Sequence, residues 1–169
     1  MAYSSSGAFS NAARSTATGD LILLNDQDRS LWDAFQITEG RAALDRALEL
    51  HGRGPYVLQG AIASLQTEVQ VDWPQVVALY GELARVTRSP VVELNRAVAV
   101  AQAGSPEAAL HLVEGLELED YPYMHSTRAE LLRRLGRAED ARVAFRRALD
   151  ITRSEPERRF LQRRLDQLT

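Results

Sequence analysis

Apolar residues recur at helical spacing along most of this chain beyond residue 30. Side chains three or four positions apart lie on one face of an α-helix, so the pattern predicts amphipathic helices. No stretch alternates apolar and polar residues over a strand length, and the hairpin turns Asn-Gly and Asp-Gly are absent, so the predicted fold class is all-α. The predicted helices are 31–50 (one helix, or two separated near 38–40), 56–68, 73–86, 91–103, 106–116, 122–135, 137–152 and 155–168.

Proline and capping residues mark the helix ends. Asp72 precedes Trp73 and Pro74, which is typical of an N-cap followed by a first turn. Ser154 has Glu157 three residues later, the form of a capping box. Glycine suits the left-handed backbone that ends many helices, so the glycines at 52 and 54 predict the end of the helix that precedes them. The glycines at 104 and 136 are likewise expected to end helices.

An internal repeat of constant spacing relates two helix pairs. It equates Ala97 with Ala129, Gly104 with Gly136, Glu107 with Glu139 and Ala109 with Ala141. Small residues at these positions let two antiparallel helices approach closely. The pattern resembles the tetratricopeptide repeat (TPR), whose usual period is slightly longer. The segment 136–148 matches its core pattern, the preceding unit departs from it at Val113 and Leu116, and 55–87 is a more degenerate candidate.

The expected organisation is therefore a stack of antiparallel helix pairs forming a TPR-like right-handed solenoid. Residues 1–20, rich in Ser, Ala, Thr and Gly, are expected to be a loosely ordered lead-in. Residues 21–169 are expected to form a single helical domain. Its clearest repeats are about 90–121 and 122–154, followed by a capping helix at 155–168.

Charge divides this chain into an acidic body and a basic end. Residues 1–127 contain 16 acidic residues and 8 arginines, whereas residues 128–169 contain 7 acidic residues and 12 arginines. Such asymmetry can mark a contact surface. Paired arginines in the basic end are most simply a solvated helix face. A nucleic-acid surface is less favoured because no aromatic residues are interleaved, and an acidic partner or polymerase surface is a third possibility.

Candidate chemistry is sparse. There is no cysteine, and the three histidines lie too far apart in sequence for a local metal pair. Asp26, Asp28 and Asp33 cluster with Arg29, but helix caps and a local salt bridge are favoured over a metal or acid–base site. No nucleotide-binding or nucleophile-elbow motif occurs. We therefore expect no enzyme activity, no cofactor and no metal.

The same features bear on location. A chain without cysteine suits a reducing compartment. No run of 18 apolar residues occurs, and the N-terminus lacks a basic region followed by an apolar one. The expected location is cytoplasmic, without membrane association.

Three segments carry a family resemblance: 19–33 (containing DQDRSLWD), 54–63 (GPYVLQGAIA) and 89–99 (SPVVELNRAVA). In this order they resemble the C-terminal TPR-like extension of a group of bacterial extracytoplasmic-function (ECF) RNA polymerase sigma factors of the sigma-70 family. In that group, two sigma domains precede the extension. The resemblance covers about residues 10–169, but the sigma domains themselves are absent from this chain.

The resemblance implies a regulatory role in transcription initiation through contacts with sigma domains, RNA polymerase or another partner. Promoter DNA would be reached only through the missing sigma domains. The alternative is a free-standing TPR adaptor that binds a peptide or protein. The candidate interaction residues lie in the DQDRSLWD segment and on the first helix of a repeat, which usually lines the concave face: Asp26, Gln27, Asp28, Arg29, Trp32, Asp33, Asn95 and Arg96.

Overall fold

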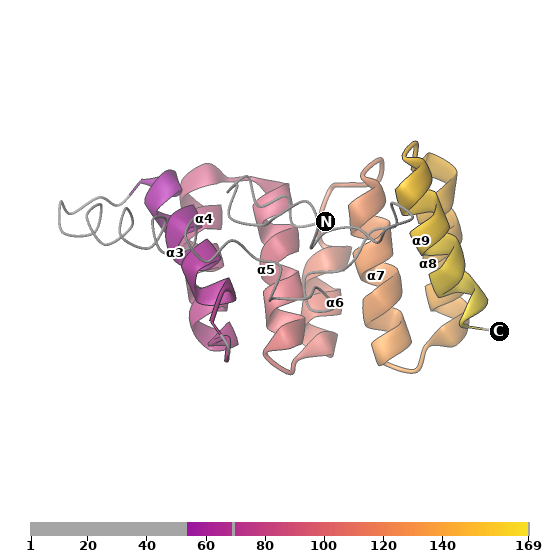
Figure 1. The fold of residues 1–169 in the computed structure, drawn as a ribbon, viewed down its shortest axis with the longest axis horizontal. Coiled ribbons are helices and arrows are strands. Elements are labelled where there is room, and N and C mark those ends of the chain that lie inside the picture. The colour runs from indigo at the N-terminus through magenta and orange to yellow at the C-terminus, as the bar shows by residue number, and fades with distance from the viewer. Residues whose placement is uncertain (1–53, 69, 169) are drawn as a thin grey trace.

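The structure is a computed structural model that describes residues 54–68 and 70–168. Within these residues every regular element is an α-helix (Figure 1). The elements are α3 (Pro55–Gln66), α4 (Trp73–Thr87), α5 (Pro90–Gln102), α6 (Pro106–Glu114), α7 (Pro122–Arg134), α8 (Ala138–Ile151) and α9 (Glu155–Asp166). They match the seven helices predicted here to within two residues at each end, and the prediction for 31–50 lies outside the described residues.

The helices pack in chain order. Each one contacts the next, from α3 on α4 through to α8 on α9, and α5 also touches α7. Short connections turn the chain back after each helix, so the helix pairs stand side by side along the long axis (Figure 1). This sequential packing confirms the predicted all-α stack of helix pairs within the described part of the chain.

The helix starts follow the predicted chemistry in most cases. Six of the seven described helices have proline in the first two positions. Backbone N–H groups in the first turn have no partner within the helix, so the missing N–H of proline costs no hydrogen bond there. The Asp72 carboxylate accepts a hydrogen bond from the Gln75 backbone N–H at 3.0 Å, so the predicted cap is confirmed. Ser154 does precede α9, but its side chain makes no capping bond. The predicted capping box is therefore wrong, and the acids of the first turn, Glu155 and Glu157, favour this end through the helix dipole.

Two helix ends at equivalent positions of the repeat are built identically. Gly104 after α5 and Gly136 after α7 have φ values of 96° and 74°. Behind Gly104, the Ser105 N–H bonds to the Val100 carbonyl and the Gly104 N–H to the Ala101 carbonyl, both at 3.2 Å. The same two bonds recur at Gly136, which is the Schellman arrangement. These ends set the sharp turns into α6 and α8.

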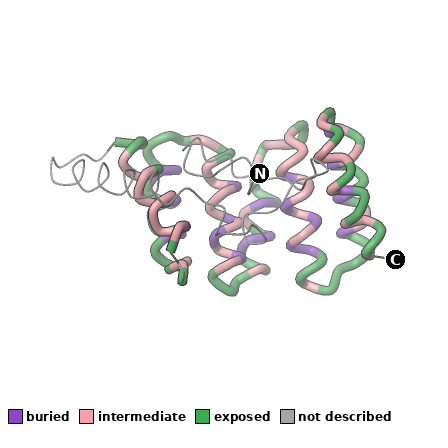
Figure 2. Tube along the Cα trace, viewed as in Figure 1, coloured by how far each residue is buried: buried purple, intermediate pink, exposed green. Residues whose placement is uncertain are grey.

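Two hydrophobic clusters hold the stack together. The larger one joins α5 to α9, and the smaller one joins α3, α4 and α5. Figure 2 shows the buried positions as stripes on the sides of the helices that face one another. Many of them are small, since the fully buried set of the larger cluster includes Ala97, Ala109, Ala129, Ala141 and Ala148. Small side chains at a helix contact reduce the distance between the axes.

Alanine replacements at two glycines should have opposite effects. Gly136→Ala forces a side chain into a left-handed backbone, and we expect a loss of about 1 kcal/mol or more of stability. Gly81 lies inside α4, where an added Cβ would be 3.7 Å from its nearest neighbour, so Gly81→Ala should gain roughly 0.5–1 kcal/mol. Urea unfolding of both variants measures the difference, and equal effects would contradict the assigned backbone conformations.

Candidate functional site

Only two of the predicted interaction residues lie within the described part of the chain. Asn95 and Arg96 are neighbours on α5, and both are half-buried. The other six, from Asp26 to Asp33, lie outside the described residues. The structure thus places Asn95 and Arg96, and the interaction role of all eight candidates stays a prediction.

Arg96 packs between α4 and α5. Its Nη1 donates to Glu93 Oε2 at 3.2 Å on the same helix, and both side chains are about one-third exposed. Its Nε is buried and has no hydrogen-bond partner among the residues that the structure describes. The closest approach on α4 is at Gly81, where an added Cβ would lie 3.7 Å from this Nε. The guanidinium therefore holds a fixed position with only part of its donor capacity used.

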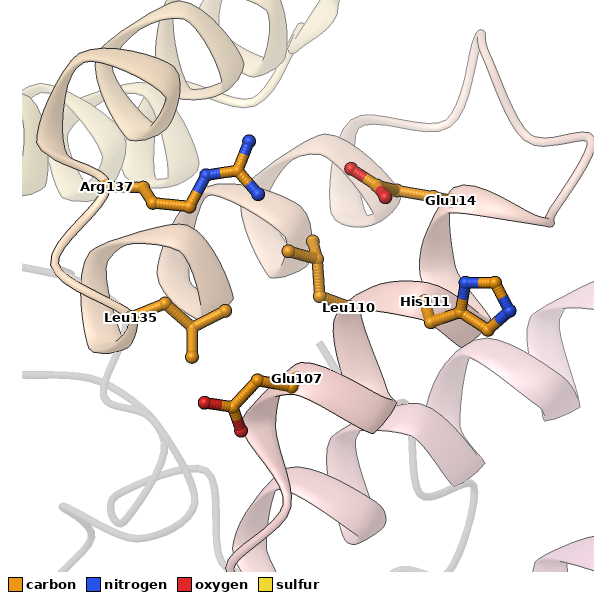
Figure 3. Close-up of a pocket in the computed structure, with 6 residues that line it drawn as sticks. All are labelled: Glu107, Leu110, His111, Glu114, Leu135 and Arg137. Carbon is orange, nitrogen blue, oxygen red and sulfur yellow. The ribbon is translucent and has the colours of Figure 1, made fainter.

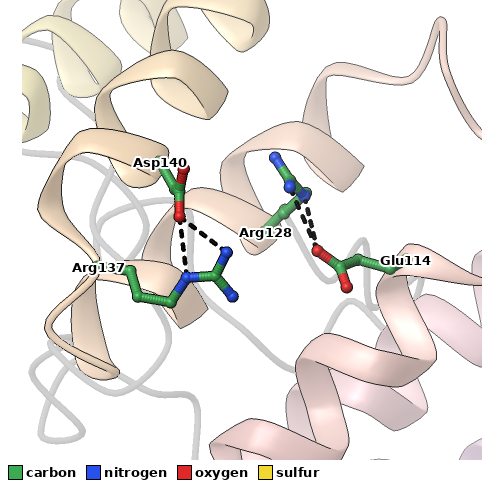
Figure 4. Close-up of polar contacts among 4 residues, drawn as sticks. All are labelled: Glu114, Arg128, Arg137 and Asp140. Carbon is green, nitrogen blue, oxygen red and sulfur yellow. Dashed lines mark hydrogen bonds and ion pairs between the residues drawn. The ribbon is translucent and has the colours of Figure 1, made fainter.

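Arg128 on α7 is the repeat counterpart of Arg96, since each precedes a fully buried alanine and the spacing between them is that of the repeat. Its Nε and Nη2 both donate to Oε1 of Glu114 on α6, at 3.3 and 3.2 Å. Figure 4 shows this pair bridging two helices, beside the separate pair of Arg137 and Asp140. An interhelical carboxylate thus satisfies Arg128.

A pocket of about 380 Å³ lies between α6 and the turn joining α7 to α8 (Figure 3). Its lining from α6 is Glu107, Leu110, His111 and Glu114, and the turn contributes Leu135 and Arg137. The three polar residues of α6 recur every three or four positions, so they share one side of the helix. This arrangement offers carboxylates, an imidazole and a guanidinium for hydrogen bonds to polar groups. No cluster suited to a metal ion occurs among residues 54–68 and 70–168.

His125 has a structural role at the start of α7. Its Nε2 lies 2.7 Å from the Glu119 carbonyl oxygen, which can only accept, so the ring nitrogen is the donor. This bond ties α7 to the loop that follows α6.

The basic end, residues 128–169, consists of the last part of α7 followed by α8 and α9. Several of its arginines are paired with acids: Arg137 with Asp140, Arg142 with Glu139, and Arg158 with Glu155 at 4.0 Å. Arg164 lies over the Phe160 ring, with 5.4 Å between its Cζ atom and the ring centroid. Arg146 is exposed and has no ion-pair partner among the described residues. This end combines structural pairs with cationic groups available to solvent.

Glu130 is the one carboxylate of α7, and two arginines of the same helix hold it. It accepts bonds from Arg133 at 2.7 and 3.0 Å, and Arg134 lies 3.5 Å away. Burial opposes its ionisation, but the Arg133 hydrogen bonds and the charges of Arg133, Arg164 and Arg134 outweigh that cost and lower the pKa of Glu130. Because Arg164 belongs to α9, this carboxylate links α7 electrostatically to the last helix.

Two tyrosines are held neutral by their surroundings. Burial raises the pKa of Tyr123 to about 12, although a hydrogen bond with Thr127 partly offsets it. Burial also raises the pKa of Tyr80, against a hydrogen bond with Gln66. The Tyr123 ring meets that of Tyr121 edge to face, with centroids 6.2 Å apart. Because even an unperturbed tyrosine is neutral near pH 7, both phenols act as packing and hydrogen-bonding groups there.

Comparison with known proteins gives a family match and a long relative. Residues 1–48 match a family of unknown function (DUF6596). The chain is 45% identical over 162 residues to an uncharacterised protein of Rhizobium meliloti (strain 1021); the match covers 92% of this chain and 38% of that relative. The chain thus spans less than two-fifths of the length of the curated relative it matches.

A solved structure of a thermophilic TPR protein from Thermus thermophilus has the same arrangement. The superposition of the two structures has a TM-score of 0.60 and covers 79% of this chain and 75% of that one. The two sequences are 22% identical. The fold of the chain is therefore TPR-like, as predicted. None of the helices between residues 54 and 168 has the length and apolar character needed to cross a membrane.

The arginine and carboxylate contacts were only partly visible in the sequence. Asn95 and Arg96 were identified as candidates, but the Glu114–Arg128 bridge and the Glu130 cluster were not. The internal repeat carried the signal for the Glu114–Arg128 bridge, because it places Arg128 at the position equivalent to the candidate Arg96. The pairs of Glu130 with Arg133 and Arg134 follow the spacing of one helix turn, which the sequence shows. The charge effect of Arg164 on Glu130 depends on α9, which no local pattern places beside α7.

Glu130→Gln should destabilise the fold in a pH-dependent way. The folded-state pKa of Glu130 is lowered, so the carboxylate stabilises the fold above the ordinary glutamate pKa, and this contribution is lost as the pH falls through the lowered value. We expect a loss of roughly 1 kcal/mol at pH 7 and a smaller one near pH 3. Urea unfolding of the variant and the parent chain at both pH values measures it.

Glu82→Gln provides the matched control. Glu82 also pairs with an arginine three residues away, but both side chains are more than half exposed. Its replacement should change stability little at either pH. A Glu130→Gln loss that stays constant between pH 3 and pH 7 would contradict the assigned electrostatic role.

Proposed function

We propose that this chain is a regulatory protein-interaction region of a bacterial ECF sigma factor. It would act in transcription initiation by contacting sigma domains, RNA polymerase or another protein partner. The proposal assigns it no catalytic step and no cofactor, and it places the protein in the cytoplasm. Promoter DNA would be contacted only by sigma domains elsewhere in the longer protein.

The observation that carries the protein-binding part is the TPR-like stack itself. Helix pairs that contact mainly their neighbours leave a long surface of side chains at fixed spacing. Groups such as Arg96 and Glu130 are already held by neighbouring side chains, so binding a partner would cost less ordering of these groups. Such a surface suits recognition of another protein.

The sigma-factor part is supported by the sequence resemblance over 19–33, 54–63 and 89–99. The length of the Rhizobium meliloti relative is compatible with it, since the match covers 38% of that protein and leaves the larger part outside. The basic end would add long-range attraction for an acidic partner, which mainly raises the association rate. A free-standing TPR adaptor has the same fold, so the test must separate the two roles by partner.

A pull-down tests the proposal directly. The full chain is immobilised and presented with RNA polymerase and, separately, with the sigma domains of the longer protein. We expect one of the two to bind. Binding should be lost in Asp28→Ala and Trp32→Ala, which change the most specific part of the resemblance, and weakened in Arg96→Gln.

Arg146→Gln is the matched control for charge. It removes one arginine from α8, outside the segments that the resemblance identifies, and should leave binding unchanged at moderate salt. Circular dichroism should show the same helicity for all variants. Absence of binding to both partners would overturn the sigma-factor role and leave the adaptor role, whereas equal weakening by Arg146→Gln would indicate a non-specific charge effect.

A further inference from the structure

The internal repeat gives the pocket beside α6 a counterpart one unit further along the chain. The spacing that equates Ala109 with Ala141 also equates α6 with α8, and the end of α7 with the end of α9. The space between α6 and the turn after α7 therefore corresponds to the space between α8 and the residues that follow α9. The two spaces differ in what fills them.

A guanidinium fills the space between α8 and the end of α9. Arg142 on α8 donates through Nη1 to Oε1 of Glu139 on the same helix. Its Nη2 donates to the backbone carbonyl of Leu168, which follows α9. Only 24% of the Arg142 side chain is exposed. The guanidinium thus joins a carboxylate of one helix to a carbonyl at the end of the next.

The pocket beside α6 keeps the carboxylate but lacks the cation. The repeat equates Glu107 with Glu139, and it places Leu110 where α8 has Arg142. The shorter, apolar Leu110 lines an open pocket of about 380 Å³. Figure 3 shows Leu110 and Leu135 pointing into this space from α6 and from the turn, with Glu107 at its edge. Glu107 is exposed and has no ion-pair partner among the described residues.

The charges around the pocket suit a cation. Arg137, the one arginine of the lining, pairs with Asp140 at 2.8 Å. Glu114 is held by Arg128 at 3.2 Å. Of the carboxylates and the guanidinium that line the pocket, only that of Glu107 has no opposite charge beside it within the described part of the chain. The C-terminal end of α7 meets the pocket too, and the negative end of a helix dipole favours positive charge.

We propose that the pocket between α6 and the α7–α8 turn binds an arginine side chain of a protein partner. The apolar stem of that arginine lies on Leu110 and Leu135, and its guanidinium bonds to the Glu107 carboxylate. The same type of bond joins Arg142 to Glu139, so the partner supplies the cation that the chain itself supplies one repeat later. The inference rests on the proposed protein-binding function and adds the kind of side chain recognised.

Methyl NMR of the full chain, labelled at leucine, tests the pocket. The reporter is the Leu135 methyl signal, which is assigned by its loss in Leu135→Ile. The probe is N-acetylarginine amide, and the control is N-acetylcitrulline amide, which has nearly the same shape without the charge. We expect the arginine probe to shift the Leu135 signal along a one-site titration curve, and the citrulline probe to leave the signal in place.

Two variants in the pocket should reduce this response. Glu107→Gln removes the carboxylate and keeps the shape of the side chain, so the affinity for the arginine probe should fall by roughly threefold or more. Leu110→Arg supplies within the chain the guanidinium that Arg142 supplies in the next repeat, so it should abolish the response. Because Leu110 is buried, circular dichroism must show that this variant keeps its helicity.

Glu117→Gln is the matched control for charge. Glu117 is exposed in the loop after α6 and does not line the pocket, so its replacement should leave the affinity unchanged at moderate salt. A response confined to the arginine probe and weakened by Glu107→Gln but not by Glu117→Gln supports the inference, even if Leu110→Arg fails to fold.

Three results would overturn the inference: no shift with the arginine probe, an equal shift with citrulline, or a response that Glu107→Gln weakens no more than Glu117→Gln does. The last of these would indicate general attraction to an acidic surface. The pull-down result stands independently, because it measures capture of RNA polymerase or sigma domains and not occupation of this pocket.

Discussion

Close contact between antiparallel helices through small side chains is the constraint on which this structure depends. Ala97 on α5, Ala109 on α6, Ala129 on α7, and Ala141 and Ala148 on α8 are all fully buried. Larger residues such as Phe145 and Leu132 are buried in the same cluster. The turns at Gly104 and Gly136 have the same geometry, so each pair re-enters the stack in the same way. Repetition of one contact therefore sets both the spacing of the pairs and the positions of their surface side chains.

That repetition also explains why charged residues at equivalent positions can be compared. Arg96 and Arg128 face the preceding helix because each is followed by a buried alanine that fixes the rotation of its helix. The chain uses arginine for all its basic residues, and a guanidinium can bridge two helices with several donors where an ammonium would act as a point charge. The two arginines differ in what the preceding helix places beside them, since Gly81 lies nearest Arg96 whereas Glu114 accepts bonds from Arg128.

The sequence predicted the seven described helices because the residues that begin and end them act locally. Proline in the first turn, Asp72 at its cap, and glycine at left-handed ends each act within a few residues. Local rules failed where another conformation was accessible: α4 ends on Arg88 in a left-handed conformation with φ of 50°, without the glycine that would have marked it. The Ser154 side chain likewise left its predicted bond unmade. The pairs of Arg96 with Glu93 and of Glu130 with Arg133 lie within one helix. The Glu114–Arg128 bridge joins separate helices, so only the packed structure could place it.

The two ends of the described stack differ in chemistry, and this difference gives the solenoid a direction. α9 covers the larger hydrophobic cluster with Leu161 and exposes arginines, among them Arg159 and Arg163, on its outer side. Stacking a further pair there would require desolvating these charges, so α9 acts as a polar cap. α3 has no charged residue along its whole length, and the only described helix that it packs closely against is α4. A charge-free helix gains more from being covered than a charged one does. Covering α3 would therefore cost less desolvation of charge than covering α9.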